Sequence, residues 1–233
     1  MKKLTVVFII LLSVVCVGVF ANGQQEAAES SDMDEGEAQE YVIGVSQPTF
    51  NHPIRQAHFW AAEVWNETHP NVEFIFMDGQ KNAAQQISQI EDLTARQVDM
   101  IMIAEHQSGS TNNALKAAKD QGIPIIAFDR TISDDSIPVA TITGDDVEYG
   151  RLCGEFIAET LDYEGNIVVI QAPEGVSVGE LRRQGFYSVI DQYPDLNVVT
   201  QQVGNWQRSI ALTVMENVLQ GFEDIDAVYA DND

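Results

Sequence analysis

The fold is indicated most clearly by residues 123–130, Ile123-Pro124-Ile125-Ile126-Ala127-Phe128-Asp129-Arg130. An apolar run that ends abruptly in two opposite charges is typical of a strand buried on both faces, as in a parallel sheet covered by helices. In open α/β sheets, ligands bind outside the carboxyl ends of the strands. Asp129 and Arg130 are therefore candidate ligand contacts, and a surface salt bridge is the alternative interpretation of the pair taken alone.

Strand patterns alternate with single helix patterns on both sides of this stretch. Before it we predict strands at 41–45, 72–76 and 99–104, with helices at 54–68, around 83–93 and at 111–120. After it we predict strands at 139–143, 167–170, 196–203 and 225–230, with helices at 147–161, 179–192 and 208–219. This alternation predicts an α/β fold with parallel sheets flanked by helices. The pattern restarts after Thr143-Gly144, which predicts two lobes, 41–143 and 144–233, with a cleft between them.

The sequence stops at Asp231-Asn232-Asp233, where the alternation calls for another helix with an Asn or Asp N-cap. A parallel sheet normally needs cover on both faces. We therefore expect an incomplete second lobe, in a fragment or a shortened gene product. We also expect residues 22–233 to be marginally stable, to expose apolar sheet surface and to bind ligand poorly.

The first forty residues differ in composition from the rest. Lys2-Lys3 precedes an uncharged, mostly apolar run, and Val19-Phe20-Ala21 provides the small residues that a signal peptidase recognises, which predicts a signal peptide at 1–21. An uncleaved membrane anchor and a lipidated Cys16 are the alternatives. Residues 22–40 carry seven acidic residues and no basic one, which predicts a disordered acidic tether.

Charge and motif content exclude several classes of protein. A net charge of −24 repels nucleic acids and anionic membrane surfaces. Cys153 is the one cysteine of the globular part, so we expect no internal disulfide and a thiol packed as a small hydrophobe. The four histidines lack metal-ligand spacing, and there is no nucleophile elbow or glycine-rich phosphate loop. We predict no enzyme, no metal site, no cofactor and no nucleic-acid partner.

Polar or aromatic side chains follow five of the predicted strands, and a sixth group lies early in a helix. The candidate ligand contacts are Gln47, His52, Asp129, Arg130, Asp145, Arg182, Trp206 and Asn232. Carboxylates accept hydrogen bonds, guanidiniums donate them in a fixed fork and an amide does both. An indole face covers the C–H side of a sugar ring. Together these side chains suit a neutral polyhydroxylated ligand.

Three motifs carry a resemblance to a known family: 125–130 (IIAFDR), 182–186 (RRQGF) and 227–233 (AVYADND). On them, the chain from about Tyr41 to Asp233 resembles the periplasmic sugar-binding proteins of the ribose- and galactose-binding type. These are receptor subunits of ABC importers with a two-lobe type I periplasmic-binding-protein fold. The resemblance implies a monomeric periplasmic receptor that binds a monosaccharide and delivers it to membrane permease subunits.

The resemblance also implies roles for individual residues. Asp129, Arg130, Arg182 and Asn232 correspond to side chains that hydrogen-bond the sugar in the family, and Trp206 to one that stacks on its ring. The first loop departs from the family, because His52 replaces a polar contact and Arg55 replaces an aromatic. This indicates a ligand other than ribose, either a different sugar or an acidic or phosphorylated one, unless Arg55 simply points to solvent.

Two other functions are compatible with the two-lobe architecture. One is a ligand-sensing protein, either a regulator or a receptor that presents a sugar or an autoinducer to a chemoreceptor or a sensor kinase. An apolar export segment stands where a sugar-responsive repressor would carry a DNA-binding helix-turn-helix. The other is a non-functional truncated paralogue.

Overall fold

The computed structural model describes residues 39–232. The predicted signal peptide, Cys16, most of the predicted tether and Asp233 lie outside these residues. Among the helices described, none combines the length and the apolar character needed to cross a membrane.

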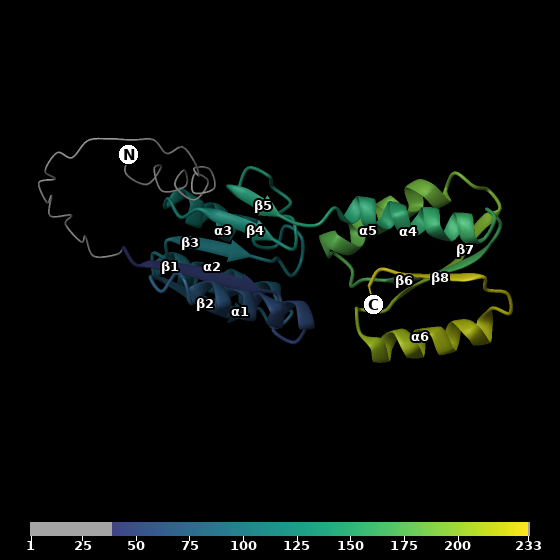
Figure 1. Ribbon diagram of the computed structural model, residues 1–233, viewed down its shortest axis with the longest axis horizontal. Helices are drawn as coiled ribbons and strands as arrows, with labels where there is room; N and C mark the ends of the chain where they lie inside the picture. Colours follow the sequence, from purple (N-terminus) through teal and green to yellow (C-terminus); the bar gives the residue numbers. More distant parts are fainter. Residues whose placement is uncertain (1–38, 233) are drawn as a thin grey trace, which may run out of the picture. The chain divides into compact units, whose positions relative to one another are not determined.

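The first sheet contains five parallel strands in the order β2-β1-β3-β4-β5 (Figure 1). Its strands are β1 (Tyr41–Gln47), β2 (Val72–Asp78), β3 (Met100–Ile103), β4 (Ile125–Phe128) and β5 (Ala140–Ile142). Its helices are α1 (Pro53–Asn66), α2 (Ala83–Ala95) and α3 (Asn112–Asp120). Because all strands run in one direction, their carboxyl ends meet at one edge of the sheet.

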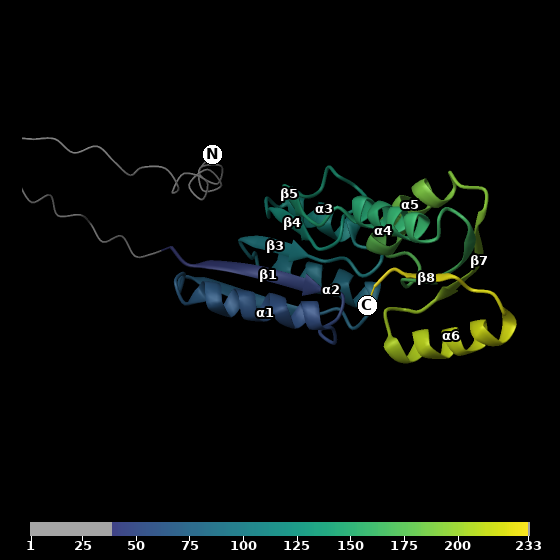
Figure 2. The same cartoon turned by 45° about the vertical axis from the view of Figure 1, so that its right-hand side comes forward.

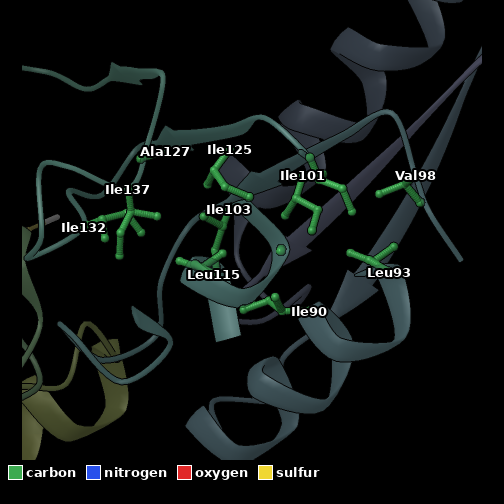
Figure 3. Close-up of a cluster of buried hydrophobic side chains, with 12 residues drawn as sticks. Ile90, Leu93, Val98, Ile101, Ile103, Leu115, Ile125, Ala127, Ile132 and Ile137 are labelled. Carbon is green, nitrogen blue, oxygen red and sulfur yellow. The ribbon is translucent and has the colours of Figure 1, made fainter. Parts of the chain in front are cut away.

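The two faces of this sheet have separate apolar clusters. Figure 3 shows the larger one, in which Ile90 and Leu93 of α2 and Leu115 of α3 pack against Ile101 and Ile125. On the other face α1 packs through aromatic rings. The Phe59 ring lies 4.2 Å from that of Phe76, and Trp65 meets Phe74 edge-on at 5.8 Å. Helices therefore lie on both faces of this sheet, as a parallel sheet requires.

The second sheet has three parallel strands in the order β7-β6-β8. These are β6 (Gly165–Gln171), β7 (Leu196–Val203) and β8 (Ala227–Ala230). Helices α4 (Asp146–Thr160) and α5 (Ser177–Ile190) lie on one side, and α6 (Arg208–Gly221) lies on the other (Figures 1 and 2).

Helices α4 and α5 approach each other closely at two glycines. A Cβ atom on Gly150 would stand 1.8 Å from the Arg182 carbonyl oxygen, and one on Gly185 would stand 1.9 Å from that of Val147. No residue with a side chain fits at either position without moving a helix. The contact fixes the middle of α5, and with it Arg182, against the first turns of α4.

The predicted α/β fold with parallel sheets is confirmed, and the element boundaries differ by at most two residues from the sequence prediction. Strand β4 begins at Ile125 rather than Ile123, because Pro124 has no N–H to donate to a neighbouring strand. Cys153 is a free thiol packed against the core of the second sheet, as predicted. Apolar side chains are exposed on the outer strands β5 and β8, where Ile142 is 62% and Val228 45% exposed.

Candidate functional site

Asp129 follows β4 in a left-handed backbone conformation, with φ at +63°. This conformation is uncommon outside glycine, but Asp and Asn tolerate it. The Asp129 N–H donates to the Ile142 carbonyl at 2.8 Å, which ties the turn to β5. The Asp129 Oδ2 atom lies 2.5 Å from Arg55 Nη2 and 3.7 Å from Arg130 Nε, so one carboxylate serves two guanidiniums.

Arg55 lies in the first turn of α1, after His52 at the N-cap and Pro53 at the first helical position. Its side chain is buried, with 4% of the residue exposed, and its Nη1 atom has no hydrogen-bond partner. The interpretation that Arg55 points to solvent is therefore wrong. No local sequence pattern indicates this burial, because the carboxylate that pairs with Arg55 is 74 residues away.

Arg130 is held by main-chain carbonyls beyond β3. Its Nη1 atom donates to the carbonyl oxygens of Glu105, at 2.7 Å, and His106, at 3.0 Å. Its buried Nε atom has no hydrogen-bond partner. Burial and then Arg55 lower the pKa of Arg130 to about 10, whereas Asp129 and Glu105 act in the opposite direction. Arg130 is still protonated at neutral pH.

Gln47 ends β1 and is completely buried. Its Oε1 atom lies 3.2 Å from His58 Nδ1, and its Nε2 atom has no hydrogen-bond partner. Burial and then Arg55 lower the pKa of His58, against the opposing effect of Asp129. A neutral His58 can donate from Nδ1 to Gln47, which leaves the Gln47 amide group to donate elsewhere. Gln47, Arg55, His58, Asp129 and Arg130 are called the first site group below.

Arg182 is the centre of a second group, at the carboxyl end of the second sheet. Its Nε atom donates to Asp146 Oδ1 at 2.9 Å, and its Nη1 atom donates to the Asp231 carbonyl at 2.6 Å. The guanidinium also lies 4.5 Å from the centre of the Tyr149 ring. Asp146, Arg182, Asp231 and Asn232 are called the second site group below.

The two adjacent acids at the start of α4 have different roles. Asp145 accepts a hydrogen bond from the Glu148 N–H at 2.9 Å and so caps the helix, whereas Asp146 pairs with Arg182. The structure therefore places Asp146, rather than the predicted Asp145, beside the other candidate ligand contacts. A sequence signal for the cap was present, since an Asp followed three residues later by a Glu is a helix-start pattern.

Asp231 is the buried carboxylate of the second site group. Its Oδ2 atom accepts from the Ala172 N–H at 2.7 Å and from Arg183 Nη1 at 3.1 Å, while Oδ1 has no hydrogen-bond partner. Burial raises the pKa of Asp231, and the Ala172 N–H and Arg183 oppose that shift. Asn232 follows directly and lines a groove that Trp206 also lines.

Trp206 lies in the turn between β7 and α6, where Asn205 and Trp206 both have left-handed backbone angles, with φ at +55° and +51°. The Arg130 guanidinium stands 5.6 Å from the centre of the Trp206 ring. Trp206 therefore contacts the first site group, although it follows a strand of the second sheet. Its buried Nε1 atom has no hydrogen-bond partner.

The unpaired buried atoms show what the first site group lacks. Gln47 Nε2, Arg55 Nη1 and Arg130 Nε are all donors, and none has a hydrogen-bond partner. A buried donor without a hydrogen-bond partner costs free energy, about 1–3 kcal/mol for each group. These groups can donate hydrogen bonds to oxygen atoms of a ligand. Within residues 39–232, no group of three or more His, Cys, Asp or Glu side chains is placed to hold a metal ion.

The chain is similar to several known sugar-binding proteins. It is 32% identical to the ribose import binding protein of Bacillus subtilis over 198 residues, which covers 85% of this chain and 64% of that protein. It is 33% identical to a galactofuranose-binding protein of Escherichia coli over 162 residues, which covers 67% of this chain and 51% of that protein. The chain thus spans between half and two thirds of the length of these curated relatives.

A solved structure has the same fold. An ABC transporter solute binding protein from Bacillus halodurans, with bound myo-inositol, superposes with a TM-score of 0.80 at 31% identity, covering 85% of this chain and 69% of that one. The model of the periplasmic binding protein domain family matches residues 43–233. This match supports the prediction of a binding protein rather than an enzyme. The chain belongs to the periplasmic binding protein domain family, as the three sequence motifs indicated.

Proposed function

We propose that this chain binds a neutral monosaccharide or a related polyol between two lobes, 41–143 and 144–233. The observation that carries the proposal is the set of three unpaired buried donors in the first site group, Gln47 Nε2, Arg55 Nη1 and Arg130 Nε. Hydroxyl groups of a sugar offer closely spaced acceptor oxygens, and each hydroxyl can also donate a hydrogen bond, which Asp129 can accept. The face of Trp206 would cover the C–H side of the ring.

The distribution of charge favours a neutral ligand over an acidic or phosphorylated one. Arg55 and Arg130 share Asp129, and the buried carboxylate of Glu105 acts on Arg130 as a second negative charge. In the second site group, Arg182 pairs with Asp146 and Arg183 pairs with Asp231. Each guanidinium therefore has a carboxylate partner, and a ligand anion would add uncompensated negative charge to a buried site.

Each candidate residue except Asp145, which caps α4, has a proposed role in binding. Asp129, Arg130, Arg182 and Asn232 hydrogen-bond the sugar, and Trp206 stacks on it. Arg55, which the sequence prediction did not include, joins them through its free Nη1 atom. Gln47 donates through its amide group, and His52 contributes from the N-cap of α1.

The same proposal extends to the cellular role. The similar proteins are described as binding ribose, galactofuranose and myo-inositol, in the first case for import. We propose that this chain is likewise the substrate-binding receptor of an ABC importer, exported to the periplasm by residues 1–21 and delivering its ligand to permease subunits. The alternatives are attachment to the membrane through a lipidated Cys16 or through an uncleaved anchor, and mass spectrometry of the exported protein distinguishes them from cleavage after residue 21.

A thermal-shift screen of the purified full chain tests the binding proposal. The panel contains D-ribose, L-arabinose, D-galactose and myo-inositol, with D-galacturonate and ribose 5-phosphate as charged comparisons. A ligand at a hundred times its Kd stabilises the folded state by about 2.7 kcal/mol, which raises the melting temperature of a chain of this size by roughly 5–10 °C. We expect such a rise with at least one neutral compound and with neither charged one.

Two substitutions and one control locate the site. Asp129→Asn and Trp206→Leu should abolish the rise. Asp134→Asn is the matched control, because Asp134 is an acid of the same lobe that pairs with Lys116 at 2.5 Å and touches neither site group. A rise that survives both substitutions, or a rise only with the charged compounds, would contradict the proposal.

A further inference from the structure

Glu105 is a buried carboxylate that is not one of the proposed sugar contacts. It lies two residues beyond β3 and is 2% exposed. Its Oε1 atom accepts from the Thr111 N–H at 2.8 Å and from the Thr111 hydroxyl at 2.7 Å, and its Oε2 atom accepts from the Gly109 N–H at 2.9 Å. These bonds close the turn that leads into α3, at the positive end of the helix dipole.

The main chain of Glu105 holds Arg130. The carbonyl oxygens of Glu105 and His106 both accept from Arg130 Nη1, at 2.7 and 3.0 Å. One residue thus fixes the turn with its side chain and the guanidinium with its backbone. Movement of the turn would move both carbonyls that orient Arg130.

A second buried side chain fixes the same segment from the other side. Gln86 of α2 is completely buried, accepts from the His106 N–H at 2.6 Å and donates to the Ala104 carbonyl at 3.0 Å. Residues 104–106 are therefore held by α2 on one side and by the Glu105 carboxylate on the other. The Ala104 N–H also donates to the Ser46 carbonyl of β1 at 3.0 Å.

Charge links Glu105 to Arg130 as well. Arg55 and Arg130 are like charges that share the carboxylate of Asp129. Two guanidiniums beside one carboxylate repel each other, and this repulsion is strong because both are buried. Glu105 supplies the second negative charge, while its oxygen atoms accept hydrogen bonds from Gly109 and Thr111 of the turn.

We propose that Glu105 is a positioning residue for Arg130. Its side chain fixes the two carbonyls that hold the guanidinium, and its charge offsets the repulsion from Arg55. The role in ligand binding rests on the proposed function, but the hold on Arg130 does not. The two are tested separately.

The first test needs no ligand. Phenylglyoxal modifies arginine side chains that are accessible, and peptide mass spectrometry gives the rate for each arginine of the folded full chain. In Glu105→Gln we expect Arg130 to react at least three times faster than in the wild type, with the rate at Arg96 unchanged. Arg96 is a suitable internal reference because its side chain is 55% exposed.

Asn82→Ala is the matched control for general loss of stability. Asn82 caps α2 in the same lobe by accepting from the Ala84 and Gln85 N–H groups. We expect Asn82→Ala to lower the melting temperature and to leave the rate at Arg130 unchanged. An Arg130 rate in Glu105→Gln no higher than in Asn82→Ala would overturn the proposal.

If Glu105→Gln does not fold, Thr111→Val replaces it. This substitution removes one hydroxyl donor from the Glu105 carboxylate and keeps the two N–H donors. A rise in the Arg130 rate is again expected, and an unchanged rate in the folded variant would count against the role of Glu105.

The second test measures binding of D-ribose and myo-inositol by calorimetry. Glu105→Gln should weaken the binding of either compound at least tenfold, and Asn82→Ala should not change it. In an Arg130→Lys background the same change should weaken binding less than twofold, because its target is gone. An equal loss in both backgrounds would refute action through Arg130. If neither compound binds the wild type, the proposed function is in question for these ligands, and the labelling rates still decide the role of Glu105.

Discussion

Removing Asp129 from its ion pair with Arg55 should destabilise the protein more than removing Arg55 does. Asp129→Asn removes the one side-chain carboxylate that pairs with Arg55, which is 4% exposed. Breaking a buried pair from this side leaves an uncompensated charge and costs about 3–5 kcal/mol. Asparagine tolerates the left-handed backbone at position 129, so strain adds little.

The opposite substitution should cost less. After Arg55→Met, Asp129 still has Arg130 at 3.7 Å, and its side chain is 28% exposed and reaches water. Methionine keeps most of the apolar packing of the arginine stem. Loss of one charged hydrogen bond that water partly replaces costs about 1–2 kcal/mol. The double variant should be close to Arg55→Met alone, which gives a coupling energy equal to the cost of Asp129→Asn, about 3–5 kcal/mol.

Urea unfolding followed by tryptophan fluorescence measures these differences. A Trp206→Phe background restricts the signal to Trp60 and Trp65 of α1, the helix that carries Arg55. The unfolding midpoint and its slope should give Asp129→Asn as the less stable single variant. A smaller loss for Asp129→Asn than for Arg55→Met, or additive losses in the double variant, would show that the pair is not a coupled buried ion pair.

Three further predictions concern other parts of the molecule. Gly150→Ala should lower the unfolding free energy by at least about 3 kcal/mol in circular-dichroism melts, because its Cβ would stand 1.8 Å from the Arg182 carbonyl, whereas Gly221→Ala, with nothing within 4 Å, should be nearly neutral. The pKa of Asp231 is raised in the folded state, so its ionisation increasingly destabilises the folded protein as pH rises above the pKa of the unfolded state. The unfolding free energy of Asp231→Asn relative to that of the wild type should therefore rise between pH 4 and 7 in urea titrations. A difference that stays constant over this range would contradict the prediction. The pKa of His58 is lowered from 6.5, chiefly by burial and then by Arg55, so NMR titration should place its midpoint below that value and Arg55→Met should move it upward; a midpoint at or above 6.5 in the wild type would refute the stated environment.

The strands and the positions of the site residues could be predicted because short-range patterns determine them. Asp129 and Arg130 directly follow an apolar run, and the buried β4 ends at Phe128 as that pattern indicated. Trp206 lies just beyond β7 for the same reason, whereas Arg182 lies in α5 and reaches the carboxyl end of β8 through its side chain. A period-two or period-3.6 pattern locates the end of an element to within a few residues, and the parallel arrangement then brings the ends together.

The partners of these residues could not be predicted from the sequence, because they come from distant elements. Arg55 is buried only because the left-handed turn at Asp129 brings a carboxylate to α1. Glu105 was missed although it follows an apolar strand in the same way as the residues that were found. Its three donors come from the start of the next helix, and no local pattern distinguishes such a buried carboxylate from an exposed one.

The two site groups orient their arginines by the same physical means. Arg130 donates to the carbonyl of Glu105 just beyond β3, and Arg182 donates to the carbonyl of Asp231 just beyond β8. In each case the carbonyl belongs to a residue just beyond the end of a strand, where it accepts no hydrogen bond from a neighbouring strand within residues 39–232. The same residue, Glu105 or Asp231, also has a buried carboxylate. A guanidinium can satisfy such a carbonyl and still have further N–H groups directed elsewhere, because its five donors form a rigid fork. A lysine has one nitrogen at a single point and cannot meet both demands in a fixed direction. Arginine rather than lysine is therefore required at both positions by the geometry of the sheet ends, independently of which sugar occupies the site.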